Sequence, residues 1–264
     1  MIKVAIAGAA GRMGQEVVRA VSSAQDIELV GAFDRSVDFA STGAMLGGGV
    51  TDVPIGQKIG AMMDETKPDI LVEFTHLAGA ADHTLNALKR GISVVIGTSG
   101  LNNEDQRAIQ LSCESYGASA ILVPNFAIGA VLMMKFAEMA AKYFPHAEVM
   151  ELHHEQKMDA PSGTAWYTAE RIAAARESSP RLPHGAVQKA PGARGGEVKG
   201  VPVHSVRLPG YVASQEVLFG GAGERLTLRH DSIDRASFMA GVLLAIREVR
   251  NVKGFVVGLD QVMG

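Results

Sequence analysis

The sequence predicts an α/β protein in two parts: a doubly wound parallel sheet, then a smaller α+β part with a mixed, largely antiparallel sheet. Short apolar runs alternate with amphipathic helical stretches from residue 2 to residue 123. Such alternation favours parallel strands with helices on both faces. Beyond residue 200 the apolar period shortens from about 3.6 residues to about 2, which is typical of consecutive strands.

The chain begins with a strand, a glycine turn and a helix. Ile2–Ala7 is a β-branched apolar run, residues 8–14 read Gly-Ala-Ala-Gly-Arg-Met-Gly, and apolar residues recur at helical spacing over 17–24. A second strand, Ile27–Phe33, ends on Asp34, about 20 residues beyond the last glycine. Glycines let the backbone approach a pyrophosphate, and the helix start supplies N–H donors to it. We therefore predict a Rossmann-like, dinucleotide-binding part in which Asp34 binds the adenine ribose.

Two features of this region leave alternatives open. The glycine spacing is G-x-x-G-x-x-G in place of the usual G-x-G-x-x-G, so the motif by itself is also compatible with a mere tight turn. Arg35, which follows Asp34, is either a solvated surface residue or a partner for the 2′-phosphate of NADP. NADH and NADPH are both compatible with the pattern.

The alternation of strands and helices resumes after a glycine-rich stretch, 36–57, which we expect to be a loose connection. Three loops follow the next strands, and ligands of parallel sheets collect at the carboxyl ends of the strands. We expect these loops to contact ribose and nicotinamide, although glycine and threonine are also common where a helix begins. The strands are predicted over 70–74, 94–96 and 120–123, the helices over 78–89 and 104–116, and the loops over 74–76, 97–100 and 124–126.

The second part begins with a helix over 128–143, whose methionine stripe is more typical of a core than of a special site. Residues 178–200 are rich in Gly, Pro and charge, so we expect a long surface loop with the composition of a mobile lid. The other elements are a strand over 147–152, a helix over Gly163–Ala175, strands over 201–208, 212–219 and 226–230, and a last helix over 235–250 that is expected to return to the first part.

Length, charge and cysteine content exclude several classes of protein. A chain of 264 residues with a formal net charge of −3 has a sizeable core and no general attraction to nucleic acid or anionic lipid. Cys113 is the only cysteine, which excludes an intrachain disulfide and a cysteine-based metal cluster. The N-terminus lacks a signal-peptide pattern, and the longest apolar region, 121–134, is too short to cross a bilayer. We expect a soluble, cytoplasmic protein.

The strongest signal for chemistry lies in residues 151–165, Glu-Leu-His-His-Glu-Gln-Lys-Met-Asp-Ala-Pro-Ser-Gly-Thr-Ala. His153 and His154 can exchange protons near neutral pH, and Lys157 supplies a positive charge. The segment from Pro161 onward reads as a helix start, whose unpaired N–H groups attract anions. Two positions for negative charge this close together suit a small dicarboxylate.

Each of these residues also has a simpler explanation. Histidine is usually a structural hydrogen-bonding residue, and lysine is usually a solvated surface group. Adjacent His153 and His154 could bind a metal with Glu151 or Glu155, but neighbours on an extended chain point to opposite faces, and no further ligand motif follows. We therefore predict a catalytic stretch without a metal.

These motifs resemble the 4-hydroxy-tetrahydrodipicolinate reductase family, formerly called dihydrodipicolinate reductase, of the diaminopimelate route to lysine. The resemblance covers the whole chain. It is carried by the glycine loop, by Gly97-Thr-Ser-Gly, by Pro124-Asn-Phe and above all by residues 151–165, which are highly specific. Residues 204–210, 223–226 and 230–232 also look like this family.

The resemblance implies hydride transfer from NADH or NADPH to a cyclic dicarboxylate, 4-hydroxy-tetrahydrodipicolinate, which gives tetrahydrodipicolinate with loss of water. It implies His153 as proton donor and acceptor, and Lys157 as a donor that also neutralises substrate charge. Substrate binding is assigned to Lys157, His154, Gly163 and Thr164. The residues that would line the cofactor are Gly8, Ala9, Ala10, Gly11, Arg12, Met13, Asp34, Arg35, Gly97, Thr98, Ser99, Val123, Pro124, Asn125 and Phe126.

The change of apolar period and the position of the last helix predict a domain organisation. A dinucleotide-binding domain would comprise 1–127 completed by 235–264, and a substrate-binding and oligomerisation domain would comprise 128–234. The family forms homotetramers through the sheet of the second domain and closes by a hinge, so both are expected here.

Several alternatives stay open. Ala10 stands where some members of the family have glycine, and Asp34 where others have glutamate, and neither change threatens the fold. The Asp34-Arg35 pair leaves the preference for NADH or NADPH open. A related two-domain reductase or amino-acid dehydrogenase acting on another small dicarboxylate fits the same pattern. A dinucleotide sensor without turnover fits less well, because it would have no use for His153 and Lys157 in one stretch.

Overall fold

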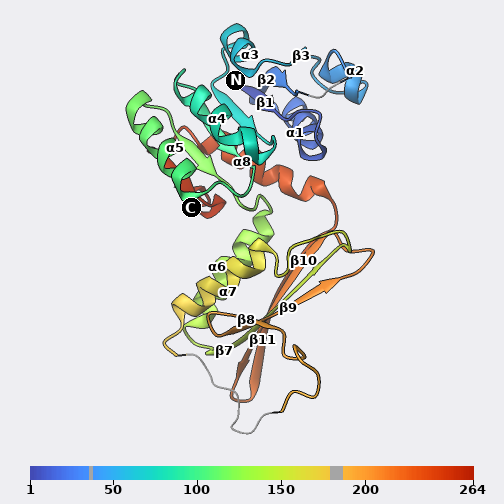
Figure 1. Cartoon of the computed structure of the whole chain (residues 1–264), viewed down its shortest axis with the longest axis vertical. Helices are drawn as coiled ribbons and strands as arrows, with labels where there is room; N and C mark the ends of the chain where they lie inside the picture. Colours follow the sequence, from blue (N-terminus) through green and yellow to red (C-terminus); the bar gives the residue numbers. More distant parts are fainter. Residues whose placement is uncertain (36–37, 179–186) are drawn as a thin grey trace. The chain divides into compact units, whose positions relative to one another are not determined.

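The computed structural model describes residues 1–35, 38–178 and 187–264, and contacts divide the chain into two compact units (Figure 1). Unit 1 consists of Met1–Phe126 together with Phe238–Gly264, and unit 2 consists of Ala127–Ser237. The last segment of the chain therefore belongs to the same unit as the first.

The described residues of unit 1 form a seven-stranded sheet in which the neighbouring strands are parallel. The order is β12-β6-β5-β4-β1-β2-β3, so the chain starts in the middle and winds outward first to one edge and then to the other. Ligands of such sheets bind where the winding reverses, here between β1 and β4. The predicted doubly wound parallel sheet is confirmed. Its strands are β1 (Ile2–Ala7), β2 (Ile27–Phe33), β3 (Ile55–Gly56), β4 (Ile70–Glu73), β5 (Ser93–Ile96), β6 (Ala120–Leu122) and β12 (Phe255–Val257).

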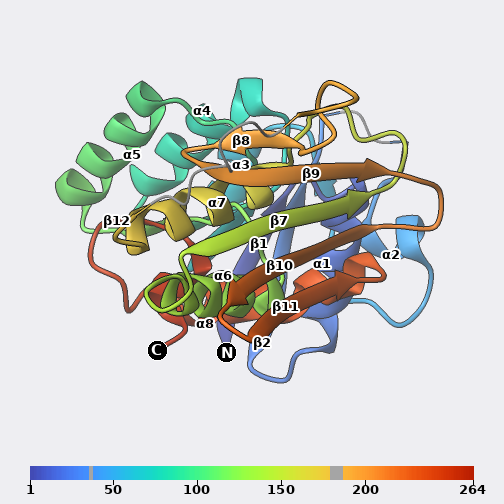
Figure 2. The same ribbon diagram turned by 90° about the horizontal axis from the view of Figure 1, so that it is seen from below.

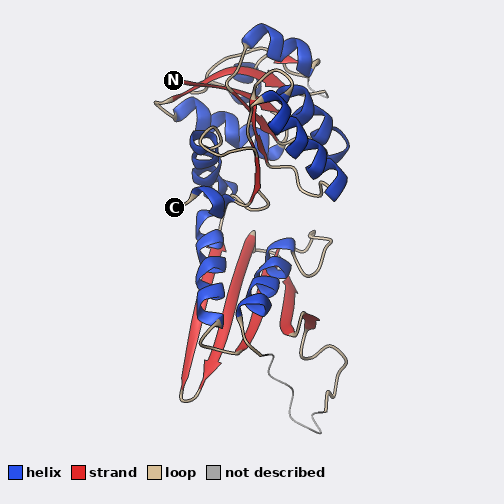
Figure 3. Ribbon diagram, turned by 90° about the vertical axis from the view of Figure 1, so that its left-hand side faces the viewer, coloured by secondary structure: helices blue, strands red, loops and turns tan. Residues whose placement is uncertain are grey.

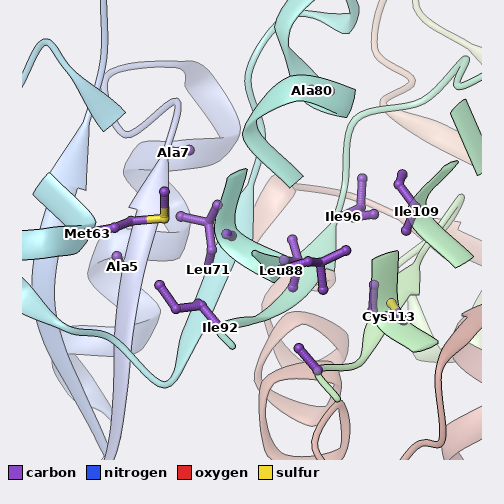
Figure 4. Packing of buried hydrophobic residues seen from close by; sticks show 14 of the residues in the cluster. Ala5, Ala7, Met63, Leu71, Ala80, Leu88, Ile92, Ile96, Ile109 and Cys113 are labelled. Carbon is purple, nitrogen blue, oxygen red and sulfur yellow. The ribbon is translucent and has the colours of Figure 1, made fainter. Parts of the chain in front are cut away.

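Helices cover both faces of this sheet. On one face α3, α4 and α5 bury Met63, Leu88 and Ile109 against strand residues such as Leu71 (Figure 4). On the other face α1 contacts α8 and buries an apolar stripe that includes Val17. Burial of these stripes stabilises each helix far more than its intrinsic propensity does. The helices are α1 (Arg12–Ser23), α2 (Thr42–Leu46), α3 (Ile59–Thr66), α4 (Leu77–Leu88), α5 (Asn103–Tyr116) and α8 (Met239–Glu248).

The prediction of a loose connection over 36–57 is wrong for the part that the structure describes, which contains α2 and β3. The buried Thr42, at the start of α2, is hydrogen-bonded to the residues that precede β3. Its hydroxyl donates to the carbonyl of Thr51 at 2.7 Å and accepts from the amide of Val53 at 2.9 Å. These bonds join residues 9 and 11 positions apart, beyond the reach of a local apolar pattern.

The described strands of unit 2 form a five-stranded sheet of order β11-β10-β7-β9-β8 (Figure 2). β7 and β9 run parallel, and the other neighbouring pairs are antiparallel. The prediction of a mixed, largely antiparallel sheet is confirmed. The strands are β7 (His146–His153), β8 (Gly196–Val198), β9 (Val201–Arg207), β10 (Ala213–Gly221) and β11 (Glu224–Ser232).

The helices α6 (Ile128–Ala141) and α7 (Gly163–Ala175) lie side by side on one face of this second sheet (Figure 3). They enclose a core that contains Met133, Val149, Ile172 and Phe219. The methionine stripe of α6 therefore contributes to the core through Met133, whereas Met139 lies on the exposed side of the helix.

Two further predictions need correction. Part of the predicted surface loop over 178–200 lies outside the described residues, and its described end is not all loop, because β8 forms there and pairs with β9. The last predicted helix, 235–250, begins as a 3-10 turn, η1 (Arg235–Phe238), and continues as α8. The strand β12, which was not predicted, then joins the parallel sheet of unit 1 beside β6.

Candidate active site

The predicted catalytic stretch begins on β7 and ends at the start of α7. Side chains alternate along a strand, so Glu151 and His153 point to the same face as Val149, which packs in the core with α6 and α7. On the neighbouring parallel strand β9, Arg207 is the register partner of His153. The sheet thereby brings together a carboxylate, an imidazole and a guanidinium.

Glu151 is the centre of this group and has a relative exposure of 0%. It accepts hydrogen bonds from His153 Nδ1, from the amide of Ser162 at 3.3 Å, and from Arg207 Nη1 and Nη2 at 3.0 and 2.8 Å. Burial raises the pKa of Glu151, but the hydrogen bonds from His153, Arg207 and Ser205 outweigh burial and lower the pKa to about 2. Glu151 is therefore ionised at neutral pH.

Arg207 was not among the predicted site residues. Its guanidinium also donates from Nη2 to the carbonyl of Asp159 at 2.6 Å and from Nε to the carbonyl of Lys157 at 3.3 Å. One side chain therefore bonds both the carboxylate that holds His153 and the loop that carries Lys157. The sequence did contain a signal for it: Arg207 shares the alternation of the core residue Val203, so it points inward, where a charge needs a partner.

Lys157 is paired with Asp159, which the sequence did not predict. Its Nζ donates to Asp159 Oδ1 at 2.7 Å, and this bond lowers the pKa of Asp159. The side chain of Lys157 is 22% exposed and that of Asp159 is 59% exposed. The amide of Lys157 donates to the carbonyl of His154 at 3.2 Å, which closes a turn between these two predicted substrate-binding residues. A ligand carboxylate would compete with Asp159 for the ammonium group.

The helix start follows directly on this loop. Ser162 is the N-cap of α7, and its hydroxyl accepts the amide of Ala165 at 3.2 Å. Gly163 and Thr164 form the first turn, and a Cβ added to Gly163 would meet no atom of the described chain within 4 Å. The backbone at Gly163 is therefore open to a ligand. His153, His154, Lys157, Gly163 and Thr164 all lie on one continuous segment of unit 2.

The glycine loop of unit 1 is tightly closed between β1 and α1. A Cβ added to Gly8 would lie 2.5 Å from a backbone oxygen of the loop after β4, and one added to Gly14 would lie 1.9 Å from the backbone oxygen of Gly8. Gly11 is the N-cap of α1 and has no side chain with which to cap it. Asp34, at the end of β2, accepts the amide of Ala10 at 3.0 Å. The predicted loop from Gly8 through Ala9, Ala10, Gly11, Arg12 and Met13 thus lies beside Asp34.

A second buried carboxylate, Glu73, connects the loops that follow β4 and β5. It has a relative exposure of 0% and accepts the hydroxyl of Thr98 at 2.5 Å and the amide of Thr75 at 3.0 Å. His83 Nδ1 lies 3.4 Å from the same carboxylate. Glu73 is not among the predicted site residues. An acidic residue at the end of an apolar strand is the sequence signal that marks it.

Aromatic packing adds the loop that follows β6. The ring centroids of Phe74 and Phe126 lie 5.4 Å apart, and a Cβ added to Gly97 would lie 2.2 Å from the ring of Phe74. The three predicted loops therefore meet at the carboxyl edge of the sheet. Gly97, Thr98 and Ser99 follow β5, Val123, Pro124, Asn125 and Phe126 follow β6, and Arg35 is exposed just beyond Asp34.

Two kinds of feature do not occur in the described ranges, 1–35, 38–178 and 187–264. No group of three or more His, Cys, Asp or Glu side chains is placed as metal ligands would be. No helix combines the length and the apolar character that a membrane-spanning segment requires.

Known proteins match the chain over its whole length. The family model "Dihydrodipicolinate reductase, N-terminus" matches residues 2–126, and "Dihydrodipicolinate reductase, C-terminus" matches residues 129–263. The 4-hydroxy-tetrahydrodipicolinate reductase of Moorella thermoacetica is 46% identical over 262 residues, which cover 99% of this chain and 98% of that protein.

Solved structures agree with these sequence matches. A dipicolinate-bound dihydrodipicolinate reductase from Paenisporosarcina sp. TG-14 is 42% identical, with a TM-score of 0.89 and 100% of both chains covered. An amine dehydrogenase from Mycobacterium smegmatis is 15% identical, with a TM-score of 0.72 over 100% of this chain and 96% of that one, and shares the fold alone. With both halves matched and full-length relatives above 40% identity, the chain is an oxidoreductase that belongs to the dihydrodipicolinate reductase family.

Proposed function

We propose that this protein is a 4-hydroxy-tetrahydrodipicolinate reductase that uses NADH or NADPH. The observation that carries the proposal is the bond between the buried, ionised Glu151 and Nδ1 of His153, on the segment that also carries Lys157 and the start of α7. This segment offers an imidazole for proton transfer and two positions for carboxylates, in a chain of the matching family.

The balanced reaction has two parts. Loss of the 4-hydroxyl group as water converts 4-hydroxy-tetrahydrodipicolinate into a conjugated cyclic imine. Addition of one hydride and one proton to that imine gives tetrahydrodipicolinate. When bound, a reduced nicotinamide supplies the hydride, and the protein must supply the proton and hold two carboxylates.

The proton donor in this proposal is His153. Hydride addition to the conjugated imine produces an electron-rich enamine, which takes up a proton to complete the reduction. An imidazole is a suitable donor because it exchanges protons near neutral pH. The donor must also be held in place, and Glu151 does so through Nδ1.

The two carboxylates of the substrate require positive partners. Lys157 would bind one of them, after displacing Asp159 from its ammonium group. The first turn of α7, with Gly163 and Thr164, would bind the other through backbone N–H groups, with His154 as a further contact. Holding the ring at both carboxylates orients its reacting carbon.

The glycine loop and the three strand-end loops of unit 1 fit a dinucleotide. The backbone at Gly8 and Gly14 is packed so closely that a side chain at either position would collide with it, and the start of α1 carries N–H groups for a pyrophosphate. Asp34 would bind the ribose hydroxyls. Arg35 is exposed beside it and would bind a 2′-phosphate, so use of both NADH and NADPH is expected.

We also propose a cytoplasmic homotetramer. The face of the second sheet opposite α6 and α7 carries Met150, Val206 and Leu218, which alternate with core residues on their strands and remain accessible in the single chain. Such a face suits pairing with another copy. A single buried cysteine, Cys113, suits a reducing compartment.

A turnover assay tests the proposed function directly. Purified protein is mixed with 4-hydroxy-tetrahydrodipicolinate and either NADPH or NADH, and the loss of nicotinamide absorbance is followed. A panel of other cyclic and linear dicarboxylates and 2-oxo acids is run alongside. Turnover confined to another acid would identify a related dehydrogenase, and cofactor binding without turnover on any of them would identify a sensor.

A further inference from the structure

We infer that Glu151 and Arg207 form a charge-balanced positioning pair that keeps a proton on Nδ1 of His153 and leaves Nε2 as the atom that transfers the catalytic proton. The inference rests on the proposed function, in which His153 is the proton donor. The inference adds two residues, Glu151 and Arg207, that do not contact the substrate in the proposed function. Both act through His153 and through the loop 154–162.

The direction of the hydrogen bond follows from the charge of Glu151. An ionised carboxylate can only accept hydrogen bonds, so Nδ1 of His153 must be the donor. The proton on Nδ1 then stays in place throughout the reaction, and the proton that moves is on Nε2. In the described part of the chain Nε2 has no hydrogen-bond partner, and the side chain is 15% exposed, which leaves this nitrogen for a ligand.

Arg207 limits how strongly Glu151 holds the protonated ring. A buried carboxylate without a counter-charge strongly stabilises an imidazolium and makes it a poor acid. Here the guanidinium makes two bonds to the same carboxylate, at 2.8 and 3.0 Å. The Glu151–Arg207 pair is neutral as a whole. His153 therefore has a well-oriented hydrogen-bond acceptor beside it, while the net charge of the two neighbouring side chains is close to zero.

The surroundings of the pair contain few other charges. Ser205 on β9 and Gln215 on β10 are the register partners of Glu151, and both are uncharged. α7 contributes only the amide of Ser162. In the adjoining loop 154–162, Lys157 and Asp159 bond one another, and Arg207 contributes to the lowered pKa of Asp159. The other titratable groups of this loop are His154 and the exposed Glu155. Glu151 and Arg207 are the charged groups that bond directly to each other beside His153.

Arg207 also holds the loop that carries Lys157. Its Nε and Nη2 donate to the carbonyls of Lys157 and Asp159, while Nη1 and Nη2 bond Glu151. A lysine at this position would keep the charge, but its single nitrogen cannot make these bonds together. The guanidinium thus sets the proton donor and the predicted carboxylate-binding loop relative to each other within unit 2.

Removal of the negative charge of Glu151 and removal of the positive charge of Arg207 should shift the titration midpoint of His153 in opposite directions. A merely structural role of the two residues would not produce opposite shifts. Hydrogen–deuterium exchange at histidine Cε1, read by mass spectrometry, gives the titration midpoint of each histidine in the full-length, ligand-free protein. In Glu151→Gln the unpaired guanidinium should move the midpoint of His153 to lower pH by about one unit or more. In Arg207→Gln the unpaired carboxylate should move it to higher pH by a similar amount, about one unit or more.

Glu148 provides a matched control on the same strand. It also binds a histidine and an arginine, with His204 Nε2 at 2.8 Å and Arg194 Nη2 at 2.6 Å. Glu148→Gln should change the midpoint of His204 and leave that of His153 unchanged. The alkaline limb of the kcat/KM profile should follow the midpoint of His153 in each variant that turns over.

Two conservative variants keep the test decisive if a glutamine variant does not fold. Glu151→Asp and Arg207→Lys keep both charges, so the midpoint of His153 should stay near its wild-type value while kcat falls by about tenfold or more from misplaced groups. Wild-type kcat in both of these variants would overturn the inference. A midpoint that is unchanged in both glutamine variants, or that moves in the same direction in both, would also overturn it.

Failure of the proposed function gives a different result. In that case the wild-type protein does not reduce 4-hydroxy-tetrahydrodipicolinate with either nucleotide. The exchange experiment needs no turnover, so it tests the positioning pair independently of that outcome.

Discussion

The ammonium group of Lys157 donates to the carboxylate of Asp159 at 2.7 Å. The lysine that is proposed to bind the substrate therefore has an anionic partner two residues away. A half-exposed pair of this kind contributes about 0.2–1 kcal/mol, which a substrate carboxylate must overcome.

Removing that competitor should strengthen substrate binding. In Asp159→Asn, KM for 4-hydroxy-tetrahydrodipicolinate should fall by about two- to fivefold, as expected from a pair of about 1 kcal/mol or less, with kcat little changed. Steady-state kinetics at low ionic strength measure KM and kcat. Asp64→Asn, which removes a carboxylate bonded to Arg90 on unit 1, is the control. A higher KM in Asp159→Asn would mean that the carboxylate positions the lysine and does not compete with the substrate.

Removing Lys157 itself should have a large effect. Lys157→Ala takes away the charge that would bind a substrate carboxylate, so kcat/KM should fall by about 10²–10³-fold, while the Kd for NADPH stays at its wild-type value. Steady-state kinetics give kcat/KM, and fluorescence titration with the nucleotide gives the Kd for NADPH. Lys199→Ala, which removes an exposed lysine paired with Glu170, should leave both numbers unchanged. Unchanged turnover in Lys157→Ala would remove this residue from the mechanism.

The glycine loop should not tolerate a methyl group at Gly14. A Cβ there would lie 1.9 Å from the backbone oxygen of Gly8, so the loop must shift and α1 must move with it. We expect Gly14→Ala to lose about 1–3 kcal/mol of stability and most of its affinity for NADPH, as measured by thermal unfolding and nucleotide titration. Gly48→Ala, where a Cβ meets nothing within 4 Å, should behave like the wild type. Equal nucleotide affinity in the two variants would contradict this role of the loop.

The hydroxyl of Thr98 should matter for both stability and cofactor binding. Thr98→Val leaves the buried carboxylate of Glu73 without one donor, which should cost about 1–3 kcal/mol and loosen the loop after β5. Weaker binding of NADPH should accompany the loss. Thr84→Val removes another buried hydroxyl, one that donates to a helix carbonyl at 2.8 Å, so it should reduce stability without changing the Kd for NADPH. The prediction fails if both variants bind the nucleotide as the wild type does.

Glu151 should make the protein sensitive to acid. Because its pKa in the folded protein, about 2, lies below the ordinary value of 4.5, its stabilising effect is complete above about pH 4.5 and is lost as the pH falls toward 2. The contribution is of the order of 3 kcal/mol. Glu151→Gln should therefore be less stable than the wild type at neutral pH, and the difference should shrink below pH 4.5.

Urea unfolding at several pH values and a fixed protein concentration measures this difference. Asp26→Asn is the comparison, because the hydrogen bond from Arg247 also lowers the pKa of Asp26 to about 2, but both side chains are exposed and screened by solvent. Asp26→Asn should therefore change acid stability less than Glu151→Gln does. An equal or larger effect of Asp26→Asn would show that the buried pair does not govern acid unfolding.

Most of the fold could be predicted because its signals are local. The bounds of β1, β2 and α7 agree with the prediction, since an apolar period, a glycine turn and a serine cap are properties of a few neighbouring residues. α3 was missed because its eight residues, with Gly60 and Thr66 among them, carry little helical signal. β8 and β12 were missed because three residues are too few to show a period.

The sequence by itself determined that a dinucleotide loop and a histidine–lysine stretch would occur, and which residue types they would contain. Only the tertiary structure decided which groups surround them. Arg207 reaches Glu151 across 56 positions of the chain because β9 pairs with β7 in one register, and a shift of one residue would turn its side chain to the other face of the sheet. Hydrogen-bond partners of buried charges depend on such long-range pairing, which no local pattern encodes.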